Sequence, residues 1–366
     1  MEESALERCI LIIPAMEPRK DFAGFIDELL QLHMGPIIVV DDGSGMKFRN
    51  LFHSINAKEN CTVLYHEKNY GKGASIKTAI RWCLEHFYSF KGIITVDCDG
   101  QHLPKDVKAV YDKLITLQEN ELVLGVRSFD NEETPEMSRL GNRVSSWIMK
   151  TLYSIDLQDT QTGLRGFHRS LLKWLLTVGG DHYDYELNVL IEAKKKSVTF
   201  NLVHVETVYF RRNIDSHYRP FTDSLYIARI MAHGVMKYFA SSLTATALDL
   251  SIFTILTKVV FSHLPLSFRL LFGTLIARIF SSILNYSINR RLVFSQDTRF
   301  YPTMLKFYTV WICQLSISYS LVLALTAATG IDEVFVKMMV DAVLALFSYQ
   351  VQLRWVFKNP NHEIRR

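Results

Sequence analysis

Cysteine is scarce and unpatterned in this sequence. Five cysteines are scattered over 366 residues, an odd number without the short spacings that hold a metal. This excludes a disulfide-stapled scaffold and a zinc ribbon. We also expect no secretory leader, because the chain opens on polar residues and the apolar run Cys9–Ala15 is too short for one. We therefore expect the first part of the chain to fold in a reducing, cytosolic setting.

Neither part of the chain shows the basic excess of a nucleic-acid-binding face. Residues 1–236 carry 28 Lys and Arg against 31 Asp and Glu, whereas residues 237–366 carry 13 against 6. The first part is thus mildly acidic. The second part is very apolar, and its positive charges flank the apolar runs, which is typical of a membrane protein. We expect the membrane, and no nucleic acid, among its partners.

Short apolar runs alternate with helical patterns between residues 9 and 126. The runs predicted as strands are Cys9–Ile13, Ile37–Val40, Thr62–Tyr65, Ile93–Val96 and Leu122–Val126. The stretches predicted as helices are Phe22–His33, Ala74–Phe87 and Pro104–Leu117. This alternation predicts an α/β fold with a mostly parallel sheet covered by helices on both faces. Ligands of such sheets bind beyond the carboxyl ends of the strands, where the polar motifs of this chain fall.

Four long apolar segments fill the second part of the chain. They are Tyr238–Phe261, Leu266–Ile288, Phe307–Ala328 and Val334–Phe357, each near the roughly 20 residues that cross a bilayer as a helix. If all four cross, nine basic residues flank the side of the two chain ends and three flank the other side. We therefore predict a multi-pass protein of the cytoplasmic membrane with both termini in the cytoplasm.

The second part also contains an internal repeat. NYSINRRLVF (Asn285–Phe294) and SYQVQLRWVF (Ser348–Phe357) share four identities in ten positions at an offset of 63 residues. Coincidence between two amphipathic helix ends is the alternative, but both copies lie at equivalent places in two predicted hairpins. The repeat predicts two similar hairpins around a pseudo-symmetry axis, a plan typical of transporters.

The stretch GIITVDCDGQH (Gly92–His102) ends an apolar run in two acids. Asp97 and Asp99 are two residues apart, so on an extended strand their carboxylates point to the same side. Converging carboxylates repel each other unless a cation lies between them, and a hard divalent ion with oxygen ligands suits them. A strand-end turn in which the aspartates cap the next segment explains the same residues, and this stretch alone leaves the two explanations level.

Two further motifs are weak by themselves. VVDDGS (Val39–Ser44) ends a buried strand in acids that can accept hydrogen bonds from a base or a ribose, or can form a helix-capping turn. NYGKGAS (Asn69–Ser75) opens a helix with two glycines around Lys72. Backbone amides and an ammonium there suit a phosphate, but a helix start that needs small residues accounts for the same letters.

In this order, the motifs IIPAMEP, VVDDGS, NYGKGAS, VDCDGQH, LGVR and DTQTGLRGF resemble the family 2 glycosyltransferases of the GT-A fold. The similarity is to their polyprenyl-phosphate branch, which is dolichol-phosphate-mannose-synthase-like, and it covers about residues 8–217. It implies a Rossmann-like cytosolic domain with a site for Mg²⁺ or Mn²⁺ at Asp97, Asp99 and Gln101, the D-x-D-x-Q of that branch. This favours the metal explanation for the two aspartates.

The resemblance also implies roles for other residues. Those expected to bind the nucleotide-sugar donor are Pro14, Met16, Glu17, Asp41, Asp42, Gly71, Lys72, Gly73 and Arg127. Those expected to receive the acceptor phosphate are Arg139, Arg143, Arg211, Ser216 and His217. Asp159 and Arg165 are expected at the reaction centre. Asp184 and Glu186 resemble an acidic pair on the acceptor side, although charges that favour a helix N-terminus account for them equally well.

The sequence departs from the family pattern at several positions. Met16 and Glu17 replace the usual aromatic and polar residues after the first proline, so this motif does not fix the base. Ile214 and His217 replace a glycine and a lysine, and a histidine there would make a phosphate contact pH-sensitive. QVQLRW (Gln350–Trp355) has the wrong spacing for the Q-x-x-R-W of processive synthases, so we do not expect polymer synthesis.

Residues 235–358 resemble the GtrA-like family of four-helix membrane proteins. Polar side chains inside its segments are costly in hydrocarbon and are expected to face the bundle interior; they include Arg278, Asn285, Asn289 and Asp341. Arg278 and Asp341 are equivalent under the 63-residue offset, and we expect them to pair with each other or to serve function.

We predict three parts: a GT-A domain over 1–217, an amphipathic linker helix over 218–236, and an all-α four-helix transmembrane domain over 237–366. The expected activity is inverting, metal-dependent transfer of a hexose, glucose, from a UDP-sugar to undecaprenyl phosphate on the cytoplasmic membrane face, for cell-envelope polysaccharide. The membrane domain would anchor the enzyme and help to flip its product. The alternatives are a lipid-linked-sugar transporter with a nucleotide-sugar-binding domain, and an enzyme whose helices only anchor it. Self-association into a homo-oligomer is left open.

Overall fold

The computed structural model describes residues 8–127, 136–206, 220–294, 300–331, 333–358 and 364–365. Within the helices, the description leaves out the side chains of residues 136–141, of residues 220–235 and of scattered positions between 266 and 338. The chain forms two compact units. Unit 1 comprises residues 1–150, 155–230 and 361–366, and unit 2 comprises residues 151–154 and 231–360.

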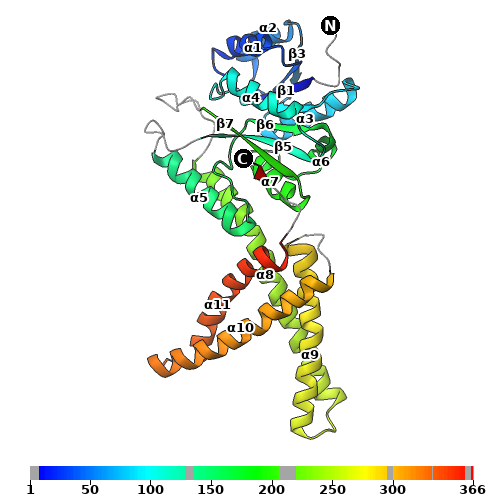
Figure 1. The fold of residues 1–366 in the computed structure, drawn as a ribbon, viewed down its shortest axis with the longest axis vertical. Coiled ribbons are helices and arrows are strands. Elements are labelled where there is room, and N and C mark those ends of the chain that lie inside the picture. The colour runs from blue at the N-terminus through cyan, green and yellow to red at the C-terminus, as the bar shows by residue number, and fades with distance from the viewer. Residues whose placement is uncertain are drawn as a thin grey trace. The chain divides into compact units, whose positions relative to one another are not determined.

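Unit 1 is built on an eight-stranded sheet with the order β3-β2-β1-β4-β6-β5-β7-β8 (Figure 1). Its strands are β1 (Cys9–Ala15), β2 (Ile37–Asp41), β3 (Cys61–Tyr65), β4 (Gly92–Thr95), β5 (Glu121–Arg127), β6 (Arg165–His168), β7 (Thr199–Val205) and β8 (Ile364–Arg365). Its α-helices are α1 (Phe22–Gln31), α2 (Arg49–Asn56), α3 (Lys72–His86), α4 (Pro104–Ile115), α5 (Glu136–Tyr153), α6 (Leu172–Leu175) and α7 (Asp184–Lys195). The last residues of α5 belong to unit 2.

The predicted α/β fold with a mostly parallel sheet is confirmed. All five predicted strands and all three predicted helices are present. The sequence did not predict β6, which runs antiparallel between β4 and β5. Its four residues, RGFH, lack an apolar run, so only pairing with both neighbours makes them a strand.

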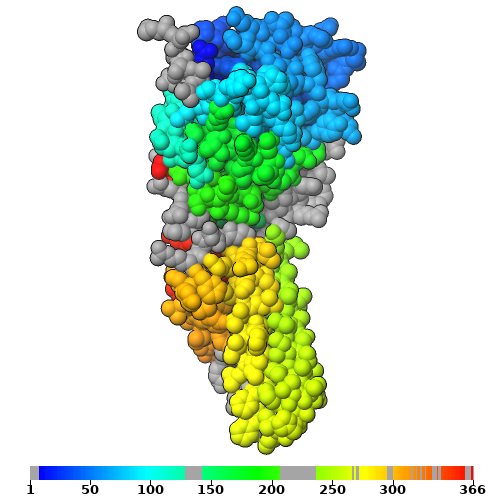
Figure 2. Space-filling model, turned by 90° about the vertical axis from the view of Figure 1, so that its right-hand side faces the viewer, coloured from blue at the N-terminus to red at the C-terminus, as the bar shows by residue number. Residues whose placement is uncertain are grey.

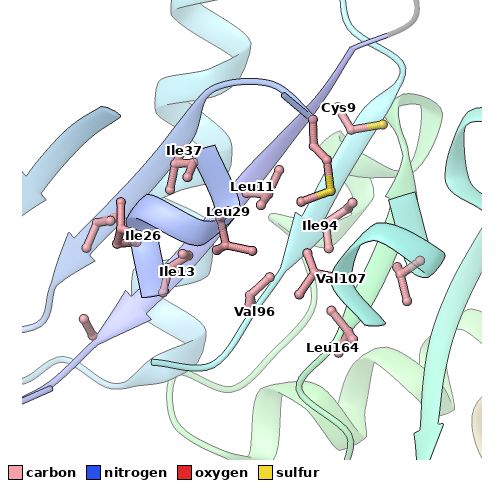
Figure 3. Close-up of a cluster of buried hydrophobic side chains, with 14 of the residues drawn as sticks. Cys9, Leu11, Ile13, Ile26, Leu29, Ile37, Ile94, Val96, Val107 and Leu164 are labelled. Carbon is pink, nitrogen blue, oxygen red and sulfur yellow. The ribbon is translucent and has the colours of Figure 1, made fainter. Parts of the chain in front are cut away.

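The core of unit 1 explains why the central strands are continuous runs of apolar residues. In β1, Leu11 and Ile13 belong to a cluster on one face of the sheet, whereas the equally buried Ile10 and Ile12 do not. Alternate residues of a strand point to opposite faces, so both faces of β1 are covered. Figure 3 shows Ile26 of α1 beside β1 in that cluster, to which α2 and α4 also contribute.

The end of the chain returns to unit 1. Ile364 and Arg365 pair in parallel with β7, and Arg365 Nη1 lies 2.6 Å from Glu121 Oε1 at the start of β5. We predicted that residues 237–366 form one domain, but residues 361–366 group with unit 1. The short strand β8 covers the hydrogen-bonding edge that β7 would otherwise expose.

The described part of unit 2 is built from helices joined by short non-helical connections. Its elements are α8 (Pro220–Ile255), which begins in unit 1, the π-helical turn η4 (Leu256–Val260), α9 (Leu266–Ile288), η5 (Asn289–Val293), α10 (Phe300–Thr329), α11 (Glu333–Val351) and η6 (Gln352–Val356). These helices coincide with the four predicted segments. In the part of the chain that the structure describes, one helical stretch, Met236–Val260, is both long and apolar enough to cross a membrane, with a mean hydropathy of 1.6 over its most apolar window. We predicted a separate linker helix at 218–236, but from Pro220 onward this stretch is continuous with α8.

The repeat in the sequence is also a repeat in the structure. The π-helical turns η5 and η6 begin at Asn289 and Gln352, which are equivalent at the offset of 63 residues. The amide of Phe294 closes η5 onto Asn289 O, as the amide of Phe357 closes η6 onto Gln352 O. Isolated π-turns are rare in helices, so their matched positions support duplication over coincidence.

The two copies pack on each other reciprocally. The rings of Phe294 and Phe357 stack at 4.8 Å between centroids. Tyr286 of the first copy stacks on Phe357 at 6.0 Å, and its equivalent Tyr349 stacks on Phe294 at 5.6 Å. Contacts that exchange partners in this way are the mark of a two-fold relation. The pseudo-symmetry axis therefore passes between the two phenylalanines.

Candidate functional site

The candidate site of unit 1 lies at one edge of the sheet. The strands β1, β2 and β4 are parallel, with Ala15 opposite Asp41 and Ile12 opposite Thr95. The motifs that follow these strands therefore meet at their carboxyl ends, where ligands of such sheets bind. This is the location that the sequence predicted.

Lys72 is the centre of an ionic cluster at this edge. Its Nζ lies 2.6 Å from Asp97 Oδ1 and 2.9 Å from Glu186 Oε1. Burial opposes the charge of the ammonium, but the two carboxylates raise the pKa of Lys72 above its ordinary value. Lys72 begins α3, and Glu186 lies in the first turn of α7, so the fold brings three distant segments together.

Asp97 is held on both sides. Burial alone would raise the pKa of this carboxyl, yet Lys72 and His102 together hold it below its ordinary value. His102 Nε2 lies 3.5 Å from Asp97 Oδ2. The same carboxylate lies against Gly163, where a Cβ atom would overlap Oδ2. Glycine at this position of DTQTGLRG is thus explained by the room that Asp97 needs.

Asp99 and Gln101 complete the expected metal-binding set. The amide of Gln101 donates to Asp99 Oδ1 at 3.0 Å. Burial and the negative charge of Asp97 raise the pKa of Asp99. The positive charges near this carboxylate do not offset these two effects. Two carboxylates and an amide are hard oxygen ligands that suit Mg²⁺ or Mn²⁺. Among the described residues no three His, Cys, Asp or Glu side chains converge on one point.

Asp42 organises the loop that was expected to bind phosphate. Its Oδ1 accepts hydrogen bonds from the amide of Tyr70 at 2.9 Å and faces His66 Nδ1 at 2.7 Å, while its Oδ2 accepts from the amide of Gly71 at 2.8 Å. Both oxygens are therefore engaged within the protein. The sequence predicted that the amide of Gly71 binds a phosphate, but in this structure the amide donates to Asp42 Oδ2.

The two glycines of NYGKGAS are explained by packing. A Cβ at Gly71, whose φ is +102°, would overlap Asp181 O, and a Cβ at Gly73 would lie 2.5 Å from Tyr185 Cβ. The loop before α7 thus presses directly on the start of α3. This close approach carries Lys72 to Glu186. A role of the two glycines toward a donor stays a prediction.

The first predicted donor motif is fixed to the second. The amide of Glu17 donates to Ser44 Oγ at 2.8 Å, and the amide of Ser44 donates to Asp41 Oδ1 at 2.9 Å. Glu17 itself is exposed with a φ of +46°, a strained conformation for this residue. Pro14 and Met16 are partly buried beside this turn. Strain of this kind is often found where a loop faces a ligand.

Asp159 fixes Arg127. The Nε and Nη2 atoms of Arg127 donate to the two carboxylate oxygens of Asp159 at 2.6 and 3.1 Å, a bidentate pair. Asp159 is fully buried, and the amide of Gln161 also donates to it. We expected Asp159 at the reaction centre; its contacts are those of a residue that positions Arg127.

Arg165, which we expected at the reaction centre, is buried in the core, and its catalytic role stays a prediction. Its Nε donates to Thr162 O at 2.8 Å and its Nη1 to Glu186 O at 2.7 Å, and the side chain is 1% exposed. Burial lowers its pKa, an effect that the charges of Glu186 and Asp159 oppose. Arg165 therefore ties the DTQTGLRG turn to α7 from within the core and does not face solvent.

Most of the expected acceptor residues fall outside the described part of the chain. Arg211, Ser216 and His217 lie in the undescribed stretch 207–219, and the side chain of Arg139 is also outside the description. Arg143 is on α5 and is exposed. Their roles stay predictions.

Arg278 and Asp341 each contact a polar side chain of their own hairpin. Arg278 Nε lies 3.8 Å from Asp249 Oδ1, and Ser318 Oγ donates to Asp341 Oδ1 at 2.6 Å. The predicted pairing of Arg278 with Asp341 is therefore wrong: α9 packs its arginine against α8, which runs beside it (Figure 2), and α11 packs its acid against α10. The carboxylate beside Arg278 belongs to the adjacent helix of the same hairpin.

Asn285 and Asn289 are satisfied by different partners. Ser241 Oγ donates to Asn285 Oδ1 at 2.9 Å between α8 and α9. The fully buried Asn289 donates from Nδ2 to Gln352 Oε1 at 3.3 Å, which joins equivalent positions of the two copies. Both asparagines face the interior of unit 2, as the cost of polar groups in hydrocarbon requires.

A double-mutant cycle on Asp249 and Arg278 distinguishes the observed pair from the predicted one. Replacing both with alanine should show a coupling free energy of about 1–2 kcal/mol for unfolding in detergent, because each single change leaves a charge without its partner. The matched control is the same cycle on Arg278 and Asp341, with coupling below about 0.5 kcal/mol. Stronger coupling in the control than in the Asp249 cycle would restore the sequence-based pairing.

Comparison with known proteins identifies two families along the chain. Residues 11–176 match the family described as Glycosyl transferase family 2, and residues 237–357 match the GtrA/DPMS transmembrane domain. An uncharacterized protein of Methanocaldococcus jannaschii is 31% identical over 207 residues, which span 56% of this chain and 82% of the relative. The UDP-N-acetylglucosamine–dolichyl-phosphate N-acetylglucosaminyltransferase of Methanococcus voltae is 30% identical over 216 residues, which span 54% of this chain and 85% of the relative. A crystal structure of residues 1–349 of S. aureus TarS aligns with 81% of this chain and 86% of its own at 15% identity, with a TM-score of 0.34, too low to support an argument.

Proposed function

Because the chain belongs to the family 2 glycosyltransferases and carries a GtrA/DPMS transmembrane domain, we propose that it transfers a hexose, glucose, from a UDP-sugar to undecaprenyl phosphate. The observation that carries the proposal is the 30% identity to an enzyme whose name gives a UDP-sugar and dolichyl phosphate, since both acceptors are polyprenyl phosphates. The donor of that enzyme makes N-acetylglucosamine the second candidate sugar. The product would serve cell-envelope polysaccharide glycosylation.

The proposed reaction is one in-line displacement at the anomeric carbon. An oxygen of the acceptor phosphate forms the new bond to that carbon while the bond to the nucleotide diphosphate breaks, so the configuration is inverted. The acceptor is already anionic, so it requires alignment and desolvation more than a strong base. Arg127, held in one orientation by Asp159, is suited to fix a phosphate group near the reacting carbon.

The leaving diphosphate carries the charge that the site must stabilise. Lys72 supplies one ammonium at the edge of the sheet. Mg²⁺ or Mn²⁺ held by Asp97, Asp99 and Gln101 would neutralise the rest of that charge when bound. His102 and Gly163 keep the carboxylate of Asp97 in place for this role.

The return of the chain end to unit 1 supports the proposed membrane topology. Apart from residues 151–154, unit 2 lies between residues 230 and 361, both of which belong to unit 1. A segment that leaves and re-enters the same folded body crosses a membrane an even number of times, as four crossings would. Both chain ends then face the cytoplasm with the active site, where the nucleotide sugar is available. The duplicated hairpins of unit 2 support a part in moving the lipid product across the membrane.

The identity of the lipid made by the purified full-length protein tests this proposal. The protein is mixed with undecaprenyl phosphate, Mg²⁺ and equal amounts of UDP-glucose, UDP-galactose, UDP-N-acetylglucosamine and GDP-mannose, and the lipids are analysed by mass spectrometry. We expect undecaprenyl phosphate plus one hexose, taken from UDP-glucose when the donors are supplied singly. An N-acetylhexosamine adduct would establish the second candidate. A folded protein that modifies the lipid with none of the donors would contradict transfer and favour the transporter alternative.

A further inference from the structure

The ionic cluster at the sheet edge contains a positive side chain, Lys72, that metal binding does not require. The ammonium of Lys72 lies against Asp97 Oδ1, an oxygen that the proposed metal needs. Lys72, Asp97 and Glu186 have side chains that are 15%, 25% and 10% exposed, so water only weakly screens the contact. A cation that approaches Asp97 therefore meets a like charge already in place.

Asp97 has little freedom to avoid this competition. Its Oδ2 faces His102 Nε2 at 3.5 Å, and the carboxylate packs against Gly163. Glu186 holds the ammonium from the other side at 2.9 Å. The lysine is therefore clamped between two acids that belong to different segments, and Asp97 cannot turn away from it without leaving Gly163.

A nucleotide diphosphate would change this balance. In its absence Asp97 and Glu186 share the one ammonium of Lys72. A diphosphate adds negative oxygens at the same edge, and an ammonium with three donors binds such oxygens as readily as carboxylates. When Lys72 moves toward them, Asp97 is left without its counter-ion and is ready to bind a divalent ion.

We propose that Lys72 is an internal counter-ion that blocks divalent-metal binding at Asp97 until the nucleotide diphosphate draws it away. Metal and nucleotide then bind cooperatively, each raising the affinity for the other by the same factor. Lys72 is a positioning residue in this role, because it acts through Asp97. The inference rests on the proposed function and on the proposed metal site, and it concerns the order in which the two ligands bind.

Titration of Mn²⁺ into the purified full-length protein, followed by the electron paramagnetic resonance of free Mn²⁺, tests the inference without turnover. Wild type should bind Mn²⁺ weakly alone and about tenfold more tightly with saturating UDP or GDP. Lys72→Met should bind Mn²⁺ about tenfold more tightly than wild type without nucleotide, and nucleotide should then add little. A lysine that only stabilised the fold would not tighten metal binding when removed.

Lys77→Met is the matched control. Lys77 lies on the same helix, is buried, and contacts Asp181 Oδ1 at 3.0 Å, away from Asp97. This variant should retain the Mn²⁺ affinity of wild type, with and without nucleotide. An increase in Mn²⁺ affinity equal to that of Lys72→Met would show that removing any nearby positive charge strengthens metal binding. That result would overturn the specific role of Lys72.

Two further outcomes decide the inference. Equal or weaker Mn²⁺ binding by Lys72→Met, in a sample that unfolds at the wild-type temperature, refutes it. If Lys72→Met does not fold, Lys72→Gln removes the charge but keeps an amide that can donate to a carboxylate, and the same expectations apply to it. The proposed function fails separately, when no donor yields a sugar-bearing lipid although Lys72→Gln or Lys72→Met tightens Mn²⁺ binding as expected.

Discussion

Replacing Asp99 with asparagine should reduce sugar transfer by about two to three orders of magnitude while the protein unfolds at the same temperature as wild type or higher. The change keeps the shape of the side chain and removes one negative charge. Burial and the charge of Asp97 raise the pKa of Asp99, which means that folding disfavours its ionised form. The asparagine therefore relieves repulsion in the fold and, at the same time, removes a ligand of the proposed metal.

The initial rate of lipid glycosylation and the thermal unfolding of the same detergent sample measure the two effects. Asp112→Asn is the control, because Asp112 is an exposed acid on α4 that pairs with Lys108. It should leave both quantities unchanged. Full activity of Asp99→Asn, or full activity of wild type in the presence of a chelator, would show that the metal assignment is wrong.

Replacing Gly163 with alanine should lower transfer by about a hundredfold without unfolding the protein. The new Cβ overlaps the carboxylate of Asp97, so that carboxylate must shift. Lys72 and His102 hold it on the remaining sides, and the shift breaks contacts with both. The backbone of Gly163 does not have a positive φ, so alanine adds no backbone strain there, and the atoms nearest to its Cβ are those of the Asp97 carboxylate.

Gly166→Ala is the matched control, three residues along the same buried segment. Its Cβ would lie 3.4 Å from the side chains of Leu114 and Val110, an ordinary contact. We expect activity within about threefold of wild type for Gly166→Ala, since volume-conserving or small changes in a core that has room are tolerated. Equal activity of the two alanine variants would show that the position of Asp97 does not limit the reaction.

The strands and helices of unit 1 could be predicted from the sequence because their signals are local. A parallel strand buried on both faces, such as β1 or β2, is a short apolar run, and the polar residues after it mark the edge where ligands bind. The strand β6 had no such signal. The repeat in unit 2 was also readable, since duplicated helix ends keep their spacing.

The sequence by itself determined the fold class, the position of the site at the sheet edge and the helices of unit 2, because each of these depends on residues close together in the chain. Only the tertiary structure decided the partners of the charged side chains. Lys72 meets Glu186, Arg127 meets Asp159 and Arg278 meets Asp249 across long stretches of chain. The energy of a buried charge depends on which opposite charge the packing brings within a few ångströms, and no local pattern of letters carries that information.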